Sequence, residues 1–110
     1  MLRVSKAKFI ETYAQKMKIE SEKNIERKLV EVVKKAGGLC IKLLTSQYIG
    51  LPDRLCLFPK GRIIFVELKS TGQKPRKIQV LVHNRLRALG FRVEVIDTIN
   101  DVINFINSVE

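Results

Sequence analysis

Apolar and polar positions recur along this chain at two periods, and the change of period marks the elements. Apolar residues at spacings of three and four, typical of helices with one buried face, predict helices at residues 5–18, 21–36, 76–89 and 99–110. Short apolar or alternating runs bounded by glycine, proline and serine predict strands at 39–44, 54–58, 62–69 and 91–97. The predicted order is therefore helix, helix, three strands, helix, strand, helix.

Each predicted helix carries one apolar stripe. The stripes comprise Phe9, Ile10, Tyr13 and Met17; Ile25, Leu29, Val32, Val33 and Ala36; Ile78, Leu81, Val82, Leu86 and Leu89; and Val102, Ile103, Phe105, Ile106 and Val109. Ser21 followed by Asn24 indicates a helix start, and the glycine pair at 37–38 indicates a stop. Thr98 with Asp101 three residues later resembles a capping box.

The connections between the predicted strands set the topology. The short Pro59-Lys60-Gly61 turn makes the strands at 54–58 and 62–69 an antiparallel hairpin. A helix between the strands at 62–69 and 91–97 makes those two strands parallel. The predicted fold class is α/β, a mixed four-stranded sheet flanked by helices. One domain of 110 residues is expected, with a basic N-terminal helix at 1–19, a core at 20–98 and a C-terminal helix at 99–110.

The charge balance indicates what kind of partner the protein binds. Twenty-one Lys and Arg against eleven Asp and Glu give a net charge of +10, which favours a polyanion: nucleic acid, an acidic membrane surface or an acidic protein. The membrane reading is weak because the first helix has few large apolar anchors. No signal-like stretch opens the chain, and no apolar run is long enough to span a membrane. Cys40 and Cys56 lack zinc-site spacing, so we expect reduced thiols in or near the core of a cytoplasmic protein.

The strand at 62–69 turns polar at its C-terminal end. Glu67 and Lys69 are two residues apart, so both side chains leave the same face of the sheet. Ile63 and Phe65 share that face and are expected to be buried. A carboxylate and an ammonium group at a strand end, before a glycine turn, are typical of the rim of an active site.

Asp53 opens the antiparallel neighbour of that strand and is therefore expected beside Glu67. Two adjacent carboxylates repel each other, and at neutral pH a bound divalent cation usually offsets this repulsion. Hard oxygen ligands favour Mg²⁺ or Mn²⁺ over zinc. Pro52 fixes its own φ and restricts the residue before it, so the turn at 50–52 is expected to aim Asp53 reproducibly.

At these residues the chain resembles a known nuclease family. Gly50-Leu51-Pro52-Asp53, fourteen residues before Glu67-Leu68-Lys69, resembles the PD-(D/E)XK signature, and the αβββαβ order of residues 20–98 matches that superfamily's core. More narrowly, the pattern is similar to the VRR-NUC family in its small stand-alone form typical of viruses. Its marks are an upstream helical Glu, the Gly-x-Pro-Asp turn, the Glu-x-Lys strand and Gln79 early in the next helix.

The resemblance implies roles for these positions. Asp53, Glu67 and the backbone carbonyl of Leu68 would bind Mg²⁺ or Mn²⁺. Lys69 would orient the attacking water or stabilise charge on the phosphate, and Gln79 would support the site. The upstream acid is Glu26 or Glu22, which lie one helical turn apart; the resemblance favours Glu26, whose distance from Gly37 is similar to that in archaeal Holliday junction resolvases. His83, the only histidine, lies off the apolar stripe of its helix and is expected at the surface or an interface.

Basic residues around the predicted site suggest contacts with the DNA backbone that give affinity without sequence readout. The candidates are Lys42, Lys69, Lys74, Arg76 and Lys77. The N-terminal segment adds Lys6, Lys8, Lys16 and Lys18, and its helix would either pack on the body or touch DNA.

The resulting hypothesis is a divalent-metal-dependent endodeoxyribonuclease that recognises DNA by shape. The resemblance implies branched substrates, with Holliday junctions first, and places the protein in the host cell cytoplasm if it is viral. Symmetric cutting of a four-way junction needs two sites, which predicts a homodimer with an isologous interface. Two alternatives stay open: a nuclease of the same fold that acts on flaps, nicked duplex or a restriction site, and an inactive basic nucleic-acid-binding protein. The sequence does not distinguish recombination, DNA repair and viral genome processing.

Overall fold

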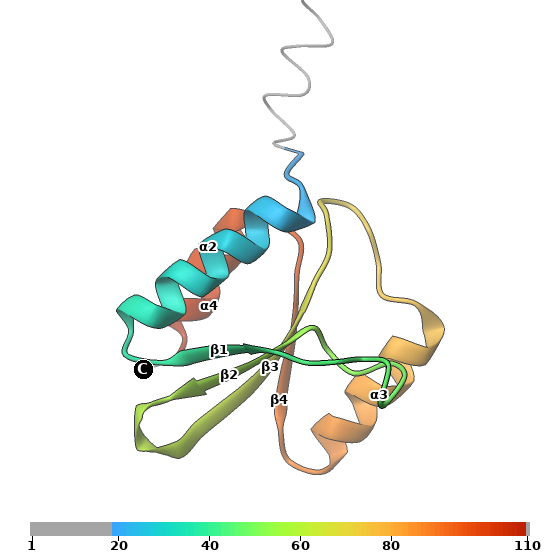
Figure 1. Cartoon of the computed structure of the whole chain (residues 1–110). Coiled ribbons are helices and arrows are strands. Elements are labelled where there is room, and N and C mark those ends of the chain that lie inside the picture. Colours follow the sequence, from blue (N-terminus) through green and yellow to red (C-terminus); the bar gives the residue numbers. More distant parts are fainter. Residues whose placement is uncertain (1–18, 110) are drawn as a thin grey trace, which may run out of the picture.

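The structure is a computed structural model and describes residues 19–109 (Figure 1). Its helices are α2 (Glu22–Lys35), α3 (Lys77–Ala88) and α4 (Ile99–Asn107), with a short 3-10 turn, η1 (Pro59–Gly61). Its strands are β1 (Leu39–Lys42), β2 (Arg54–Phe58), β3 (Arg62–Leu68) and β4 (Arg92–Ile96). The predicted basic helix at 5–18 lies outside the described residues.

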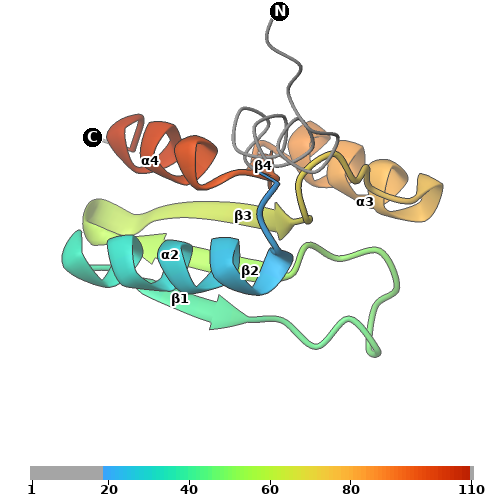
Figure 2. The same ribbon diagram turned by 90° about the horizontal axis from the view of Figure 1, so that it is seen from above.

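The four strands form one mixed sheet in the order β1-β2-β3-β4. β1 pairs antiparallel with β2, β2 antiparallel with β3, and β3 parallel with β4. α2 and α4 pack together over one face of this sheet, whereas α3 lies apart from them toward the other side of β4 (Figures 1 and 2). The predicted α/β fold class, the hairpin and the parallel pair are thereby confirmed.

The main core lies between the sheet and the pair α2–α4. Leu29 of α2 and Val102 of α4 are fully buried there, against the β3 residues Ile64, Val66 and Leu68. Because side chains alternate along a strand, this arrangement sends Ile63 and Phe65 to the opposite face. The expectation that both are buried is wrong for Ile63, which is 40% exposed, and Phe65 is only half-buried.

The buried face of α3 also differs from the prediction. Leu81 and Leu89 of the predicted stripe are 66% and 69% exposed, whereas Gln79, Val82 and His83 are buried. The helix is rotated so that polar side chains meet the polar end of β3, and hydrogen bonding of Gln79 there compensates for its burial. The prediction that His83 lies at the surface or at an interface is therefore wrong, because the residue is buried within the protein.

The predicted helix starts are confirmed by their caps. The Ser21 hydroxyl accepts a bond from the Asn24 N–H at 3.2 Å, and the Thr98 hydroxyl accepts one from the Asp101 N–H at 2.9 Å. β1 ends at Lys42, two residues before the predicted end, because the chain then leaves the sheet in a loop that contacts α3. Gly50 lies at that contact, where an added Cβ would come within 2.8 Å of the Ile78 carbonyl.

Cys40 and Cys56 face each other across β1 and β2 with their sulfur atoms 4.0 Å apart. Both are free thiols, Cys56 buried and Cys40 half-buried, as the sequence predicted. Between residues 19 and 109, no helix has both the length and the apolar character required to cross a membrane.

Candidate active site

Glu67 is the centre of a polar cluster at the C-terminal end of β3. The residue is 1% exposed. Its Oε2 accepts a hydrogen bond from Gln79 Nε2 at 2.9 Å and lies 3.4 Å from the Lys69 ammonium. The Gln79 side chain is fixed in turn, because its Oε1 accepts a hydrogen bond from the Arg76 N–H at the start of α3. Glu67 is therefore in direct contact both with Lys69, two residues later, and with Gln79, twelve residues further along the chain.

Asp53 joins this cluster from the start of β2. The β2–β3 register pairs Arg54 with Val66, so the next pair along the ladder places Asp53 opposite Glu67. The Asp53 Oδ2 accepts the Leu68 N–H at 2.9 Å, which fixes the carboxylate beside β3. The predicted convergence of the two acids at this end of the hairpin is observed.

The upstream end of α2 contributes Glu22. The segment leading into α2 is anchored at Glu20, whose backbone bonds to Thr71 and whose carboxylate accepts the Ile99 N–H at 3.1 Å. These bonds hold the first turn of α2 beside the loop that follows β3. The charges of Asp53 and Lys69 consequently act on Glu22.

Glu26, one turn later, has a different partner. Its carboxylate lies 3.3 Å from the guanidinium of Arg54, whose side chain is only 13% exposed. Arg54 also donates to the Cys40 carbonyl at 3.3 Å, so it links β1, β2 and α2. Of the two candidate acids, Glu22 is exposed and is acted on by the charges of Asp53 and Lys69, whereas Glu26 forms an ion pair with Arg54.

The pKa values of the acids reflect this crowding. Burial, and then the nearby Asp53 charge, raise the pKa of Glu67 to about 7, against the opposing effect of Lys69. Burial, followed by the Asp53 charge, also raises the pKa of Glu22. Such raised values are typical of sites where carboxylates are gathered for chemistry or for a cation.

His83 is a member of the site that the sequence did not predict. It lies one turn after Gln79 on α3, is 1% exposed, and places its Nε2 4.0 Å from Glu67 Oε1. Within the described part of the chain, these two buried atoms have no hydrogen-bond partner. The i, i+4 spacing of Gln79 and His83 was the available sequence signal, because it puts both on one helix face.

The cluster supplies few protein ligands for a cation. Among residues 19–109, no three His, Cys, Asp or Glu side chains lie close enough together to hold a metal ion by themselves. Two carboxylates and a backbone carbonyl are nevertheless a usual protein share for Mg²⁺, which keeps several waters and takes oxygens from substrate phosphates. The unpartnered Glu67 Oε1 is consistent with such a role.

The remaining basic candidates lie around this end of the sheet or on the segment after it. Lys42 is exposed at the end of β1, and its charge acts on Glu22. Lys74, Arg76 and Lys77 are exposed between β3 and the first turn of α3.

Comparisons with known proteins agree with this fold. No family model matches the chain. "Putative nuclease p44" of Acyrthosiphon pisum secondary endosymbiont phage 1 is 45% identical over 82 residues, which cover 74% of this chain and 88% of that protein. A solved structure described as "VRR_NUC domain" superposes with a TM-score of 0.75 at 30% identity, over 83% of this chain and 100% of that one.

The order of elements and the acidic cluster at the end of the hairpin define an α/β nuclease core of the PD-(D/E)XK type. Within that class, the chain belongs to the VRR-NUC family, in its small viral form.

Proposed function

We propose that the protein is a divalent-metal-dependent endodeoxyribonuclease that hydrolyses DNA phosphodiester bonds and selects its substrate by structure. The observation that carries the proposal is the convergence of Asp53 and Glu67 beside Lys69 at one end of the β2–β3 hairpin. With a divalent ion bound, two carboxylates and a lysine at a strand end can promote direct attack of water on a phosphodiester, without a covalent enzyme intermediate. We propose four-way junctions as the leading substrate, by family resemblance.

Asp53, Glu67 and the Leu68 carbonyl would hold a Mg²⁺ or Mn²⁺ ion. The raised pKa of Glu67 supports this, because a carboxyl group that is buried, and that lies beside a second carboxylate, resists ionisation when no cation is bound. When bound, the ion would polarise the phosphate and lower the pKa of a water molecule.

The protein's own side chains supply the remaining functions. The Lys69 ammonium provides a fixed positive charge where the phosphate gathers negative charge during hydrolysis. Gln79 orients the Glu67 carboxylate through its 2.9 Å hydrogen bond, and the Arg76 N–H in turn orients Gln79. This chain of contacts makes Gln79 a positioning residue rather than one that touches the substrate.

Cleavage of a DNA panel tests the proposal. Four-way junctions, flaps, nicked duplex, linear duplex and single strands would be incubated with Mg²⁺, Mn²⁺ or EDTA. We expect cleavage only with a divalent ion, and fastest for junctions. Equal rates on linear duplex and junctions would exclude the resolvase assignment, and a preference for flaps would favour the alternative nuclease. DNA binding with no metal-dependent cleavage would identify the protein as an inactive DNA-binding member of the family.

Asp53→Ala should abolish metal-dependent cleavage, because it removes one of the two converging carboxylates. DNA affinity, measured by fluorescence anisotropy, should change less than about threefold, since phosphate contacts from lysine and arginine dominate binding. Asp101→Ala, on α4 and outside the site, is the control. Cleavage by Asp53→Ala at the wild-type rate would contradict the assignment.

The upstream acid can be assigned by comparing Glu22→Gln with Glu26→Gln. The charges of Asp53 and Lys69 act on Glu22, so its replacement should lower cleavage by roughly 10- to 100-fold, the range found for residues that orient a metal site. Glu26→Gln removes the ion pair to Arg54 and should chiefly lower the free energy of unfolding. Single-turnover cleavage and urea unfolding of both variants separate the two effects. The opposite pattern would make Glu26 the upstream acid.

A homodimer would supply two active sites for a four-way junction, and one sheet face supports it. Leu39, Leu57 and Ile63 form a row across β1, β2 and β3 on the face away from α2 and α4. Leu39 is 63% exposed and Ile63 40%, although sheet faces with such side chains are normally covered. We propose that this row lies in an isologous interface with a second copy.

Ile63→Glu should convert the dimer to a monomer in sedimentation equilibrium, because it places two like charges near the symmetry axis. The monomer should nick junctions without making paired cuts. Ile103→Glu, on α4 and 37% exposed, is the matched control. A monomeric wild-type protein, or a dimeric Ile63→Glu variant, would contradict this interface.

A further inference from the structure

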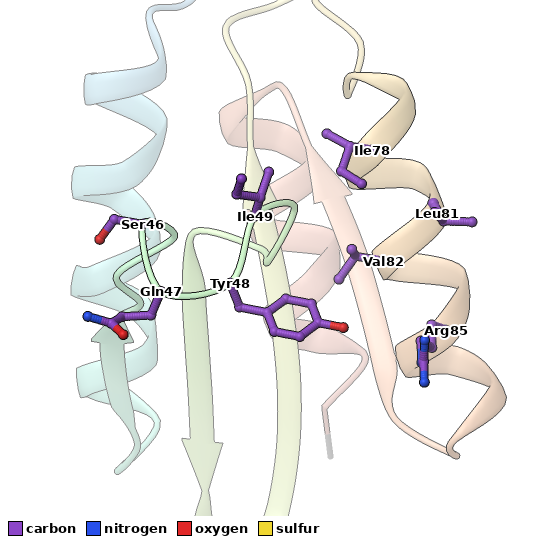
Figure 3. Close-up of a pocket in the computed structure, with 8 residues that line it drawn as sticks. All are labelled: Ser46, Gln47, Tyr48, Ile49, Ile78, Leu81, Val82 and Arg85. Atoms are coloured by element: carbon purple, nitrogen blue, oxygen red, sulfur yellow. The ribbon is translucent and has the colours of Figure 1, made fainter.

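A groove lies between α3 and the loop that joins β1 to β2, beside the active site. Its volume is about 530 Å³, within the range of pockets that hold small organic ligands. Figure 3 shows the Tyr48 ring extending from the loop toward α3, across from Val82, with Ile78 above and Arg85 below on the same helix. The complete lining is Ser46, Gln47, Tyr48, Ile49, Ile78, Leu81, Val82 and Arg85.

The two segments that form the walls of the groove also carry active-site residues. On α3, Ile78 and Val82 flank Gln79, which bonds to Glu67. On the loop, residues 46–49 precede Gly50, and Asp53 follows three residues later. A group that occupies the groove would therefore lie next to a phosphate held at the Asp53–Glu67 site.

The charges on the two walls favour an anionic occupant. Residues 43–52 carry no charged side chain, and residues 68–93 carry no Asp or Glu. The second segment instead contains basic residues, of which Arg85 lines the groove and is exposed. A second copy docked here through a twofold axis would bring like charges together with no carboxylate from either wall to offset them.

The lining is also suited to a flat aromatic group. Tyr48 is 51% exposed and Ile49 67%, so both offer apolar surface to solvent beside a polar phosphate site. Any nucleobase can stack on an aromatic side chain, whatever the nucleic-acid sequence. An arginine adds a positive charge and a planar contact surface. A base within a continuous duplex is stacked on its neighbours and is not free to enter a side groove.

We propose that this groove binds an unpaired nucleobase of the DNA substrate, next to the scissile phosphate, with Tyr48 as the stacking surface. This inference rests on the proposed nuclease function and adds a structural reason for branch selectivity. Branch points and flaps present unstacked bases, and continuous duplex does not. The groove would therefore contribute binding free energy only for substrates with an interruption near the cleaved bond.

The test uses the full-length protein in EDTA and flap or junction DNA with 2-aminopurine as the unpaired base at the branch. Wild-type binding should quench the 2-aminopurine fluorescence. Tyr48→Ala should abolish the quenching and weaken binding of this DNA by roughly 10-fold, the scale of one base–aromatic stack. Tyr48→Phe should retain both properties. Leu44→Ala, 71% exposed and outside the groove lining, should behave like wild type.

An abasic residue at the same position is the matched DNA control. For that DNA, Tyr48→Ala and wild type should bind equally. The proposal is overturned if wild-type binding leaves the fluorescence unchanged, or if Tyr48→Ala weakens binding of abasic and base-containing DNA alike. It is also overturned if Leu81→Lys turns a dimer into a monomer, which would assign the groove to a second copy. Quenching without metal-dependent cleavage would refute the proposed nuclease function and still support the base site.

Discussion

Glu67→Gln is expected to lower DNA cleavage by roughly 10,000-fold or more, because losses of about this size follow the removal of one essential catalytic group. The side chain keeps its shape and can still accept the hydrogen bond from Gln79 Nε2, but it loses the negative charge needed to hold a cation. Single-turnover cleavage of junction DNA in Mg²⁺ measures the effect. Glu94→Gln on the neighbouring β4, half-buried beside Arg92, is the control and should cleave at nearly the wild-type rate.

The same substitution should raise the free energy of unfolding in EDTA at pH 8. The pKa of Glu67 is about 7 in the folded protein and close to 4.5 when unfolded. Between these pH values the folded state binds more protons than the unfolded state. The free energy of unfolding of the wild type should therefore fall as pH rises from 4.5 to 7, by roughly 3 kcal/mol at most. Urea unfolding across this range should show the decline for wild type and a much smaller one for Glu67→Gln. If wild-type stability rose over this pH range in parallel with that of the variant, the raised pKa of the buried Glu67 carboxyl would be contradicted.

Lys69→Ala is the second substitution with a large expected effect. The Lys69 ammonium lies 3.4 Å from Glu67 Oε2, and the Lys69 side chain is only 19% exposed, so it is positioned to act on a bound phosphate at low dielectric. Loss of one such electrostatic group should lower the maximal cleavage rate by roughly 100- to 1000-fold. Because this effect arises in the transition state, single-turnover rates should fall far more than DNA affinity does.

Lys74→Ala provides the matched control for Lys69, since it removes an exposed lysine only five residues further along. Its effect should be confined to a modest loss of DNA affinity and a slightly shallower salt dependence. If Lys69→Ala weakened binding and left the single-turnover rate intact, Lys69 would be a phosphate-binding residue and not a catalytic one.

The positions of the acids show how far local pattern can predict a site. Asp53 and Glu67 were placed together because an antiparallel hairpin puts the start of one strand beside the end of the other, and the register confirms that reasoning. Gln79 was identified only through a family resemblance, since an isolated helical glutamine carries little information. The structure then provides a physical reason, the 2.9 Å bond to Glu67.

The choice between Glu22 and Glu26 could not be made from spacing. Both acids lie on one side of α2, and the decision depends on how the first turn of that helix is anchored to residues 71 and 99, far away in the sequence. The partner of Glu26 is Arg54 on β2, and this contact cannot be predicted from the pattern of residues within α2.

By itself, the sequence determined the order of the elements, the caps at Ser21 and Thr98, and the pairing of β2 with β3, because these depend on neighbouring residues and on a short turn. Only the tertiary structure decided which faces are buried. Burial of His83 and exposure of Ile63 follow from the packing of α3 on one end of the sheet and of α2 and α4 across its other face. A helix with several apolar residues can rotate about its axis at little local cost, so long-range packing and the bonding of polar groups at Glu67 fix its orientation.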